Sequence, residues 1–149
     1  MKRLLFVCLS MSFILSSCSL DYRLERREDR LYGRWAFDEA FYRNNGAIFR
    51  DNIFDEFGGD IVEFFPDYSA AYEDASRGGD FFWGEWEIFA ERDNGDDDVD
   101  FFLDMYFFDD RGFESFSYIG EVRNLTYNRM RIRAYDRDGV YTFRLRKID

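Results

Sequence analysis

The amino-acid sequence predicts an all-β fold, an antiparallel up-and-down barrel of about eight strands. Phe, Trp and Tyr make up 21% of the 149 residues, and aromatic side chains favour strands. Apolar and polar residues alternate in successive segments, as in strands that have one buried face. Clusters of Gly, Asn and Asp separate these segments, which predicts short turns between neighbouring strands. A β-sandwich is the alternative, but regular hairpin spacing favours a closed barrel, which has no edge strands.

The start of the chain predicts an export signal. A basic head, residues 1–3, precedes an apolar run, residues 4–15, that is shorter than the roughly 20 helical residues that span a bilayer. The run ends in Leu15-Ser16-Ser17-Cys18, which resembles the lipobox of bacterial lipoprotein signal peptides. The resemblance implies cleavage before Cys18 and acylation of this residue, which anchors the protein in a membrane. An ordinary cleaved signal or an interfacial apolar helix is the alternative.

These boundaries divide the chain into a signal peptide (residues 1–17), a lipidated cysteine with a tether that can carry a short helix (18–30), and a barrel domain (31–149). Strand patterns in the barrel domain cover residues 31–41, 61–65, 68–73, 82–90, 99–108, 113–122, 130–135 and 140–147. In the first strand, Leu31, Gly33, Trp35, Phe37 and Phe41 are predicted to share one face. The apolar residues of the 48–57 connection are expected to fold over one end of the barrel.

The residue types that are present argue against catalysis. The sequence contains no histidine, which excludes Ser-His-Asp and Cys-His arrangements and His-containing zinc sites. Paired carboxylates can hydrolyse glycosides, but no pair stands out in the sequence. The acidic run at residues 93–100 fails the EF-hand pattern, because Arg92 and Leu103 occupy positions that require acids, so it predicts a hairpin turn. We expect no enzyme activity, no cofactor and no metal.

Charge and aromatic residues leave two surfaces open to interpretation. The net charge of −11 argues against nucleic-acid binding, although bases outnumber acids over residues 121–149. We expect these bases to pair across strands with Asp38 or Glu121, and a basic stripe that docks an anionic glycan or an acidic partner is the alternative. Another set of side chains lies opposite the apolar faces, and is either covered by the 48–57 connection or exposed as a docking patch. This set comprises Trp83, Phe102, Tyr106 and Phe108.

Several motifs of the barrel domain resemble small lipocalin-like lipoproteins of the Bacteroidetes. They are Gly33-x-Trp35, Phe65-Pro66-Asp67, Trp83-Gly84-Glu85-Trp86 and Tyr141-Thr142-Phe143-Arg144-Leu145. The resemblance implies that Trp35 packs at the closed end of the barrel, with Arg144 or Arg146 over it in a cation–π contact. Unlike longer lipocalins, the chain has short strands and no C-terminal helix.

The resemblance and the exclusions together predict a non-catalytic, lipid-anchored protein of the cell envelope. Ser19 stands where an aspartate would signal inner-membrane retention, which favours the outer membrane. The barrel is expected to bind a small apolar ligand or an envelope partner, and a ligand inside it would be lined by Trp86, Phe101, Met105 and Phe116. The alternative is an interaction or inhibitor-type lipoprotein that docks a protein or glycan through its outer aromatic face. A binding barrel requires an apolar cavity of roughly a few hundred Å³, whereas a docking module has a filled core.

Overall fold

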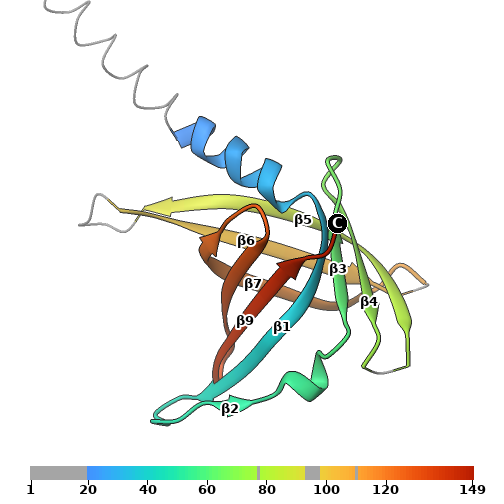
Figure 1. Ribbon diagram of the computed structural model, residues 1–149, viewed down its shortest axis with the longest axis vertical. Coiled ribbons are helices and arrows are strands. Elements are labelled where there is room, and N and C mark those ends of the chain that lie inside the picture. The colour runs from blue at the N-terminus through green and yellow to red at the C-terminus, as the bar shows by residue number, and fades with distance from the viewer. Residues whose placement is uncertain (1–19, 77, 93–97, 110) are drawn as a thin grey trace, which may run out of the picture.

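The computed structural model describes residues 20–76, 78–92, 98–109 and 111–149. Eight antiparallel strands form a closed barrel in the order β1-β3-β4-β5-β6-β7-β8-β9, and β9 pairs back onto β1 (Figure 1). The strands are β1 (Gly33–Asn44), β3 (Ile61–Phe64), β4 (Ser69–Asp74), β5 (Asp80–Arg92), β6 (Val99–Phe108), β7 (Glu114–Leu125), β8 (Arg129–Tyr135) and β9 (Gly139–Lys147). This arrangement confirms the predicted barrel. The structure adds β2 (Asp51–Asn52), which pairs with β1 and was not predicted.

Alternation along the strands builds one core inside the barrel. In β6, Phe101, Leu103, Met105 and Phe107 are buried, while Tyr106 points outward. The same pattern holds in β5, where apolar side chains point inward and glutamates point outward. Successive side chains of a strand point to opposite faces of the sheet, so the inner residues of all eight barrel strands meet in the interior. The inner faces predicted for β5 and β6 are confirmed.

A β-bulge changes the predicted face of β1. The register between β1 and β9 shifts between Phe37 and Glu39. One extra residue moves the side chains that follow it to the other face, so Ala40 joins Trp35 in the interior. Phe41 turns outward, and its ring centroid lies 3.8 Å from the guanidinium carbon of Arg50. The prediction that Phe41 shares the inner face is wrong because sequence alternation does not reveal a bulge.

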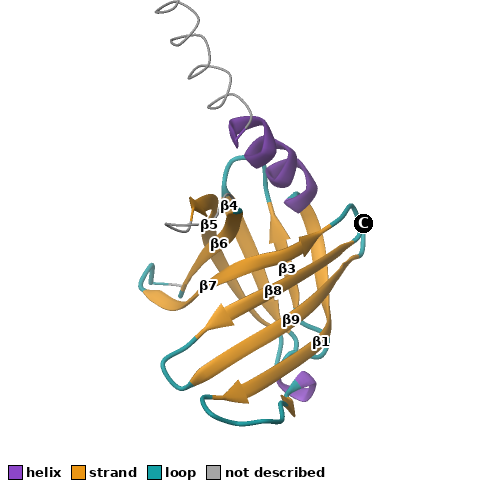
Figure 2. Ribbon diagram, turned by 90° about the vertical axis from the view of Figure 1, so that its left-hand side faces the viewer, coloured by secondary structure: helices purple, strands orange, loops and turns teal. Residues whose placement is uncertain are grey.

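The two ends of the barrel are covered by different segments (Figure 2). At one end, residues 20–31 form a helix whose Leu20, Leu24 and Leu31 pack against the core. The described part of the predicted tether is therefore a helix packed on the barrel. Among the described residues, no helix combines the length and the apolar character needed to cross a bilayer.

The 48–57 connection covers the other end. It contains the 3₁₀ helix η1 (Phe54–Glu56), and Phe57 follows with a ring centroid 5.4 Å from that of Phe37 and 5.0 Å from that of Phe143. Ile48 and Phe49 are exposed. The connection therefore folds over one end, as predicted, and Phe57 is the residue that joins the core.

Candidate functional site

The barrel interior is filled with side chains. Trp86, Phe101 and Met105 are buried inside the barrel, and Phe116 is half-buried and packs against the same core. Phe116 stacks on the ring of Phe107 with centroids 4.9 Å apart. The apolar cavity that Met105 lines has a volume of about 20 Å³, enough for about one water molecule. The candidate lining residues thus point inward as predicted, but they pack into the core, and the apolar cavity beside Met105 is too small for a ligand.

Trp35 lies at the end of the barrel that the helix covers. Trp35 is fully buried, and its Nε1 donates a hydrogen bond to the carbonyl oxygen of Leu31 over 2.7 Å. Nζ of Lys147 lies 5.2 Å from the Trp35 ring and donates to the carbonyl oxygen of Arg30 over 3.2 Å. Gly33 has a φ of 103°, a conformation that side chains disfavour, and Lys147 packs against it. The helix and the last strand therefore both hold Trp35.

The basic residue over Trp35 is Lys147, which corrects the expectation of Arg144 or Arg146. Trp35 and Lys147 are direct partners in the β1–β9 register, so their side chains lie on the same inner side of the sheet. Arg144 and Arg146 have different partners on β1. Arg144 forms an ion pair with Glu39 over 2.8 Å, and Arg146 pairs with Asp38 over 3.2 Å.

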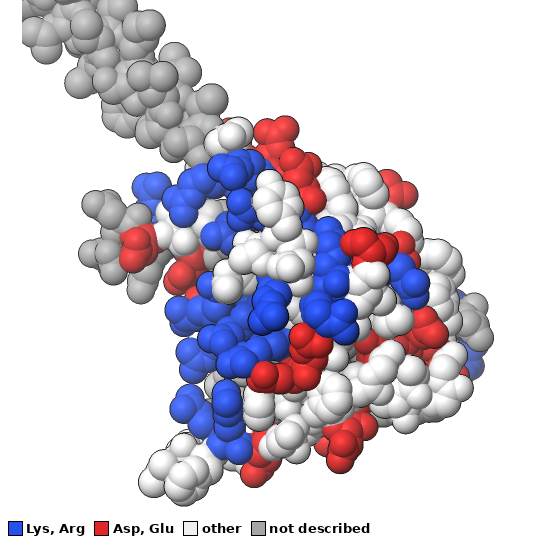
Figure 3. All heavy atoms as spheres, viewed as in Figure 1, with Lys and Arg blue, Asp and Glu red and all other residues white. Residues whose placement is uncertain are grey.

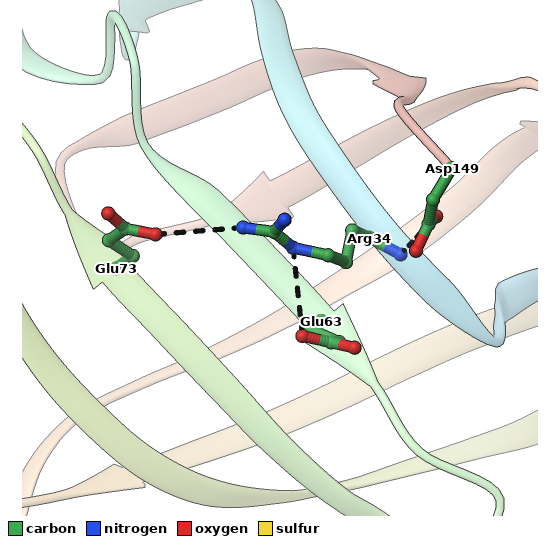
Figure 4. A network of polar contacts seen from close by, with 4 residues as sticks. All are labelled: Arg34, Glu63, Glu73 and Asp149. Atoms are coloured by element: carbon green, nitrogen blue, oxygen red, sulfur yellow. Dashed lines mark hydrogen bonds and ion pairs between the residues drawn. The ribbon is translucent and has the colours of Figure 1, made fainter.

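Polar contacts on the outside connect three strands with the C-terminus (Figure 4). The backbone amide of Arg34 donates to Oδ1 of Asp149 over 2.9 Å. The guanidinium of Arg34 lies 3.7 Å from carboxylates of Glu63 and Glu73. The side chains of Arg34, Glu63 and Glu73 are 31–46% exposed to solvent, so each ion pair contributes little to stability. We assign the network a structural role.

Aromatic side chains are exposed on the outside of β5 and β6. We define the outer aromatic face as Tyr68, Phe81, Trp83 and Tyr106, all of which are exposed. Trp83 is 59% exposed, and its ring meets that of Phe81 edge to face with centroids 5.1 Å apart. The 48–57 connection therefore leaves Trp83 uncovered. The other two residues of the predicted patch, Phe102 and Phe108, are half-buried, and Phe102 stacks on Phe89.

An acidic groove adjoins this face. It has a volume of about 460 Å³ and lies between the helix, the turn after β3 and the strands β5 and β6. Its lining includes Tyr68 and Tyr106 together with the carboxylates of Glu28, Asp67, Glu85 and Glu87. Tyr68 has a φ of 66°, which is rare for a residue with a side chain. Aromatic rings and carboxylates are the groups that bind organic cations, so the groove is suited to lysine or arginine side chains.

Hydrogen bonds set the protonation of groups in and beside the groove. The hydroxyl and amide of Ser69 donate to Asp67 over 2.6 and 3.1 Å, and these bonds lower the pKa of the Asp67 carboxyl. The hydroxyl of Tyr106 donates to Asp104 over 2.7 Å, which raises the pKa of Tyr106. At neutral pH the groove therefore holds an ionised Asp67 and a protonated Tyr106. Among the described residues, no group of three or more acidic or thiol side chains is arranged to hold a metal ion.

The groove also exposes one edge of β5. Pairing of β4 with β5 ends at Ser69 and Glu85, whereas β5 continues to Arg92. The Trp86 amide still donates to the Tyr68 carbonyl oxygen over 2.9 Å. Backbone groups of alternate residues face the same side of a strand, so those of Ile88 face this edge too. No described strand pairs with it there, which leaves room for an extended peptide. The unequal lengths of the predicted strands 68–73 and 82–90 were a signal for this edge.

The structure shows one of the two predicted charge pairs between strands and not the other. Asp38 accepts from Arg146 of β9, as expected. Glu121 pairs with Arg123 of its own strand over 2.7 Å, and the arginines of β9 do not reach it. Most of the acidic run at residues 93–100 lies outside the described residues, so its turn stays a prediction.

The comparisons with known proteins do not extend this picture. No protein-family model, curated protein or solved structure matches the chain. The geometry of the filled barrel and its outer faces is therefore what bears on function.

Proposed function

We propose that this protein is a non-catalytic, lipid-anchored cell-envelope protein that docks a partner protein through its outer aromatic face and the adjoining acidic groove. One contrast carries the proposal: the interior cavity measures about 20 Å³, whereas the outer groove measures about 460 Å³ and adjoins exposed rings. A filled barrel suits a rigid scaffold, and an exposed aromatic patch marks an interaction surface. This contrast supports a docking site on the outside of β5 and β6.

The chemistry of the groove indicates an extended partner segment that carries lysine or arginine. Glu85 and Glu87 flank the exposed edge of β5, and Glu28 and Asp67 face them across the groove. Main-chain hydrogen bonds to the edge would supply affinity, and alternate basic side chains would reach the carboxylates and tyrosine rings.

A model peptide tests this docking site. Trp83 is exposed while Trp35 and Trp86 are buried, so quenching of tryptophan fluorescence by an added ligand reports mainly on the outer aromatic face. We expect a peptide of alternating lysine and valine to bind, and the affinity to fall when salt rises from about 50 to about 300 mM. Glu85→Lys with Glu87→Lys should remove this binding. The matched control, Asp51→Lys with Asp55→Lys, changes exposed acids away from the groove and should leave binding unchanged. Equal binding of a glutamate–valine peptide would refute the site.

The lipid anchor is the second part of the proposal. It is supported by the Leu15–Cys18 pattern, and Cys18 precedes the described helix by two positions in the sequence. An acyl group there would hold the barrel close to a membrane, and Ser19 favours the outer membrane. Mass spectrometry of membrane-extracted protein should find acylated Cys18, and Cys18→Ser should release the protein from the membrane. A mature chain that begins elsewhere without acyl mass would exclude the anchor.

A small apolar ligand inside the barrel is the second candidate. The fold is compatible with a lipocalin-like binding protein, and the interior cavity is lined by apolar and aromatic side chains. Occupation would require rings such as Phe107 and Phe143 to move apart. Fluorescence titration with a fatty-acid probe measures this directly, and a stoichiometric signal that Trp83→Ala leaves unchanged would favour the interior.

A further inference from the structure

A second surface lies on β8. Its outward positions, with the turn before it, contain tyrosine at both ends and three arginines between them. We define this set as the arginine row: Tyr127, Arg129, Arg131, Arg133 and Tyr135. The alternate residues Met130, Ile132 and Ala134 are buried in the barrel, which fixes the row on the outside. Tyr127 is 76% and Tyr135 51% exposed.

The arginines of the row have no ion pair among the residues that the structure describes. Neighbouring arginines do: Arg144 and Arg146 pair with acids of β1, and Arg123 pairs with Glu121. Within the row, the guanidinium of Arg133 lies 5.3 Å from the ring of Tyr135. Three cationic groups therefore remain for a ligand from outside.

The register of β8 and β9 places like charges opposite each other. Arg129 is the direct partner of Arg146, and Arg131 is the direct partner of Arg144. Like charges at directly opposite positions destabilise a sheet. Figure 3 shows basic side chains gathered in a band that runs from the helix across this part of the barrel. An anion bound along the band would offset the repulsion.

We propose that the arginine row binds a linear anionic glycan. Alternate residues of a strand are about 6.6 Å apart, so the three guanidiniums form a line about 13 Å long, which suits an extended chain. Guanidinium groups bind carboxylate, sulfate or phosphate oxygens in pairs. Arg30 lies over the ring of Tyr127 and Arg133 over the ring of Tyr135, and the exposed remainder of each ring offers a surface on which a sugar can stack. A lipid surface fits less well, because the row follows a single strand and so suits one extended chain better than a planar membrane.

This site shares no residue with the docking face proposed above, although Tyr135 of the row and Tyr106 of the outer aromatic face line one hollow across β6, β7 and β8. The arginine row lies on β8, whereas the outer aromatic face lies on β5, β6 and the turn before β4. Changes in the row leave the acidic groove intact, so each proposal can fail without the other.

Binding to immobilised heparin and to polygalacturonate tests the row in the full-length protein in detergent, with neutral dextran as the blank. We expect both anionic glycans to bind, and Arg129→Gln with Arg131→Gln to weaken binding at least about tenfold, a loss of about 1.4 kcal/mol. The same double change should leave the melting temperature unchanged or raise it, since it removes both like-charge pairs. Arg92→Gln with Arg111→Gln is the matched control and should bind as the native protein does.

Two further measurements separate a glycan site from general attraction to anions. Tyr127→Ala with Tyr135→Ala should weaken glycan binding and leave binding of polyglutamate unchanged, because only sugars stack on the rings. The proposal is overturned if native protein fails to bind either anionic glycan, or if the control variant loses as much affinity as the arginine variant. Binding to anionic lipid vesicles without binding to glycans would assign the row to the membrane and also overturn it.

Discussion

At the scale of single residues, register and backbone conformation decide which side chain contacts Trp35. Lys147 reaches the indole because it lies directly opposite in β9, and Gly33 makes room for it. A Cβ on Gly33 would lie 3.1 Å from Oδ1 of Asp149 and 3.2 Å from Cε of Lys147. A glycine at position 33 therefore permits both the positive φ and the close packing of the last strand.

Gly33→Ala should lower the free energy of unfolding by about 1–3 kcal/mol, because it combines backbone strain with crowding of Lys147. Urea denaturation measures the loss. Gly46→Ala is the control, since Gly46 also has a positive φ, of 81°, but nothing lies within 4 Å of its Cβ position. If Gly33→Ala lowers the free energy of unfolding no more than Gly46→Ala does, packing of Gly33 against the last strand contributes nothing to stability.

Tyr72 and Asp60 form a buried polar pair. The Tyr72 hydroxyl donates to Oδ2 of Asp60 over 2.5 Å, and the Ser76 amide donates to Oδ1 over 2.9 Å. Burial first, and then the bond to Asp60, raise the pKa of Tyr72 well above its ordinary value of 10.0. The folded state therefore keeps this proton at a pH where the unfolded chain releases it.

Stability should consequently fall as the pH rises above about 10, by at most about 1.4 kcal/mol per pH unit for this group. Below that pH both states are protonated, and the contribution of Tyr72 is complete. Tyr72→Phe should lower stability at neutral pH by about 1–3 kcal/mol and make the alkaline slope shallower. Denaturation series between about pH 8 and pH 11 measure both effects. An unchanged slope in the variant would assign the alkaline loss to other tyrosines.

At the scale of elements, the helix of residues 20–31 belongs to the fold. Leu20, Leu24 and Leu31 are spaced so that they lie along one narrow stripe, and that stripe packs on the barrel end. Arg27 lies 3.7 Å from the ring of Phe101, and burial lowers the pKa of its guanidinium. Arg30 donates to the carbonyl oxygen of Leu125 over 3.1 Å.

Leu24→Asp should lower the melting temperature, since it places a carboxylate in the apolar contact between helix and barrel and costs about 2–3 kcal/mol. Glu25→Ala changes the exposed neighbouring position and serves as the control. Thermal unfolding followed by near-ultraviolet circular dichroism reports the change. If both variants have the same melting temperature as the native protein, the helix acts only as a tether.

At the scale of the whole molecule, a filled barrel carries two outer faces of opposite character. The acidic groove lies on β5 and β6, and the arginine row lies on β8, in a chain whose net charge is −11. Closing the sheet brings the basic C-terminal strands next to β1, where Arg144 and Arg146 meet their acids. Only β7 lies between β6 and β8, and Tyr106 of the outer aromatic face and Tyr135 of the arginine row line one hollow across these strands. The two surfaces therefore adjoin each other on the outside of the barrel.

Enlarging the interior tests whether the barrel is a packed core. Met105 borders the small apolar cavity, so Met105→Ala should lower the free energy of unfolding by about 2–4 kcal/mol and create a site for a small apolar compound such as benzene. Met105→Leu keeps the volume and should cost less than about 1.5 kcal/mol. Calorimetric titration and denaturation measure the two effects. Tight binding of an apolar ligand by the native protein would contradict the packed interior.

The sequence by itself determined the eight barrel strands and the inner faces of β5 and β6, because alternation with period two and turn residues are local properties. Regular hairpin spacing favoured the closed barrel over the sandwich. Phe101, Leu103 and Met105 could be placed inside, and Trp83 and Tyr106 outside, from this pattern alone. The exclusion of catalytic and zinc sites that require histidine likewise depended on composition only.

The tertiary structure decided what depends on contacts between distant segments. The bulge that turns Phe41 outward, the choice of Lys147 over Arg144, and the docking of the helix all follow from register and closure. The alternation of apolar and polar residues does not reveal how much space is left inside the barrel, because that space depends on how side chains from eight strands interdigitate. The exposed edge of β5 and the opposed arginines of β8 and β9 arise from pairing between strands.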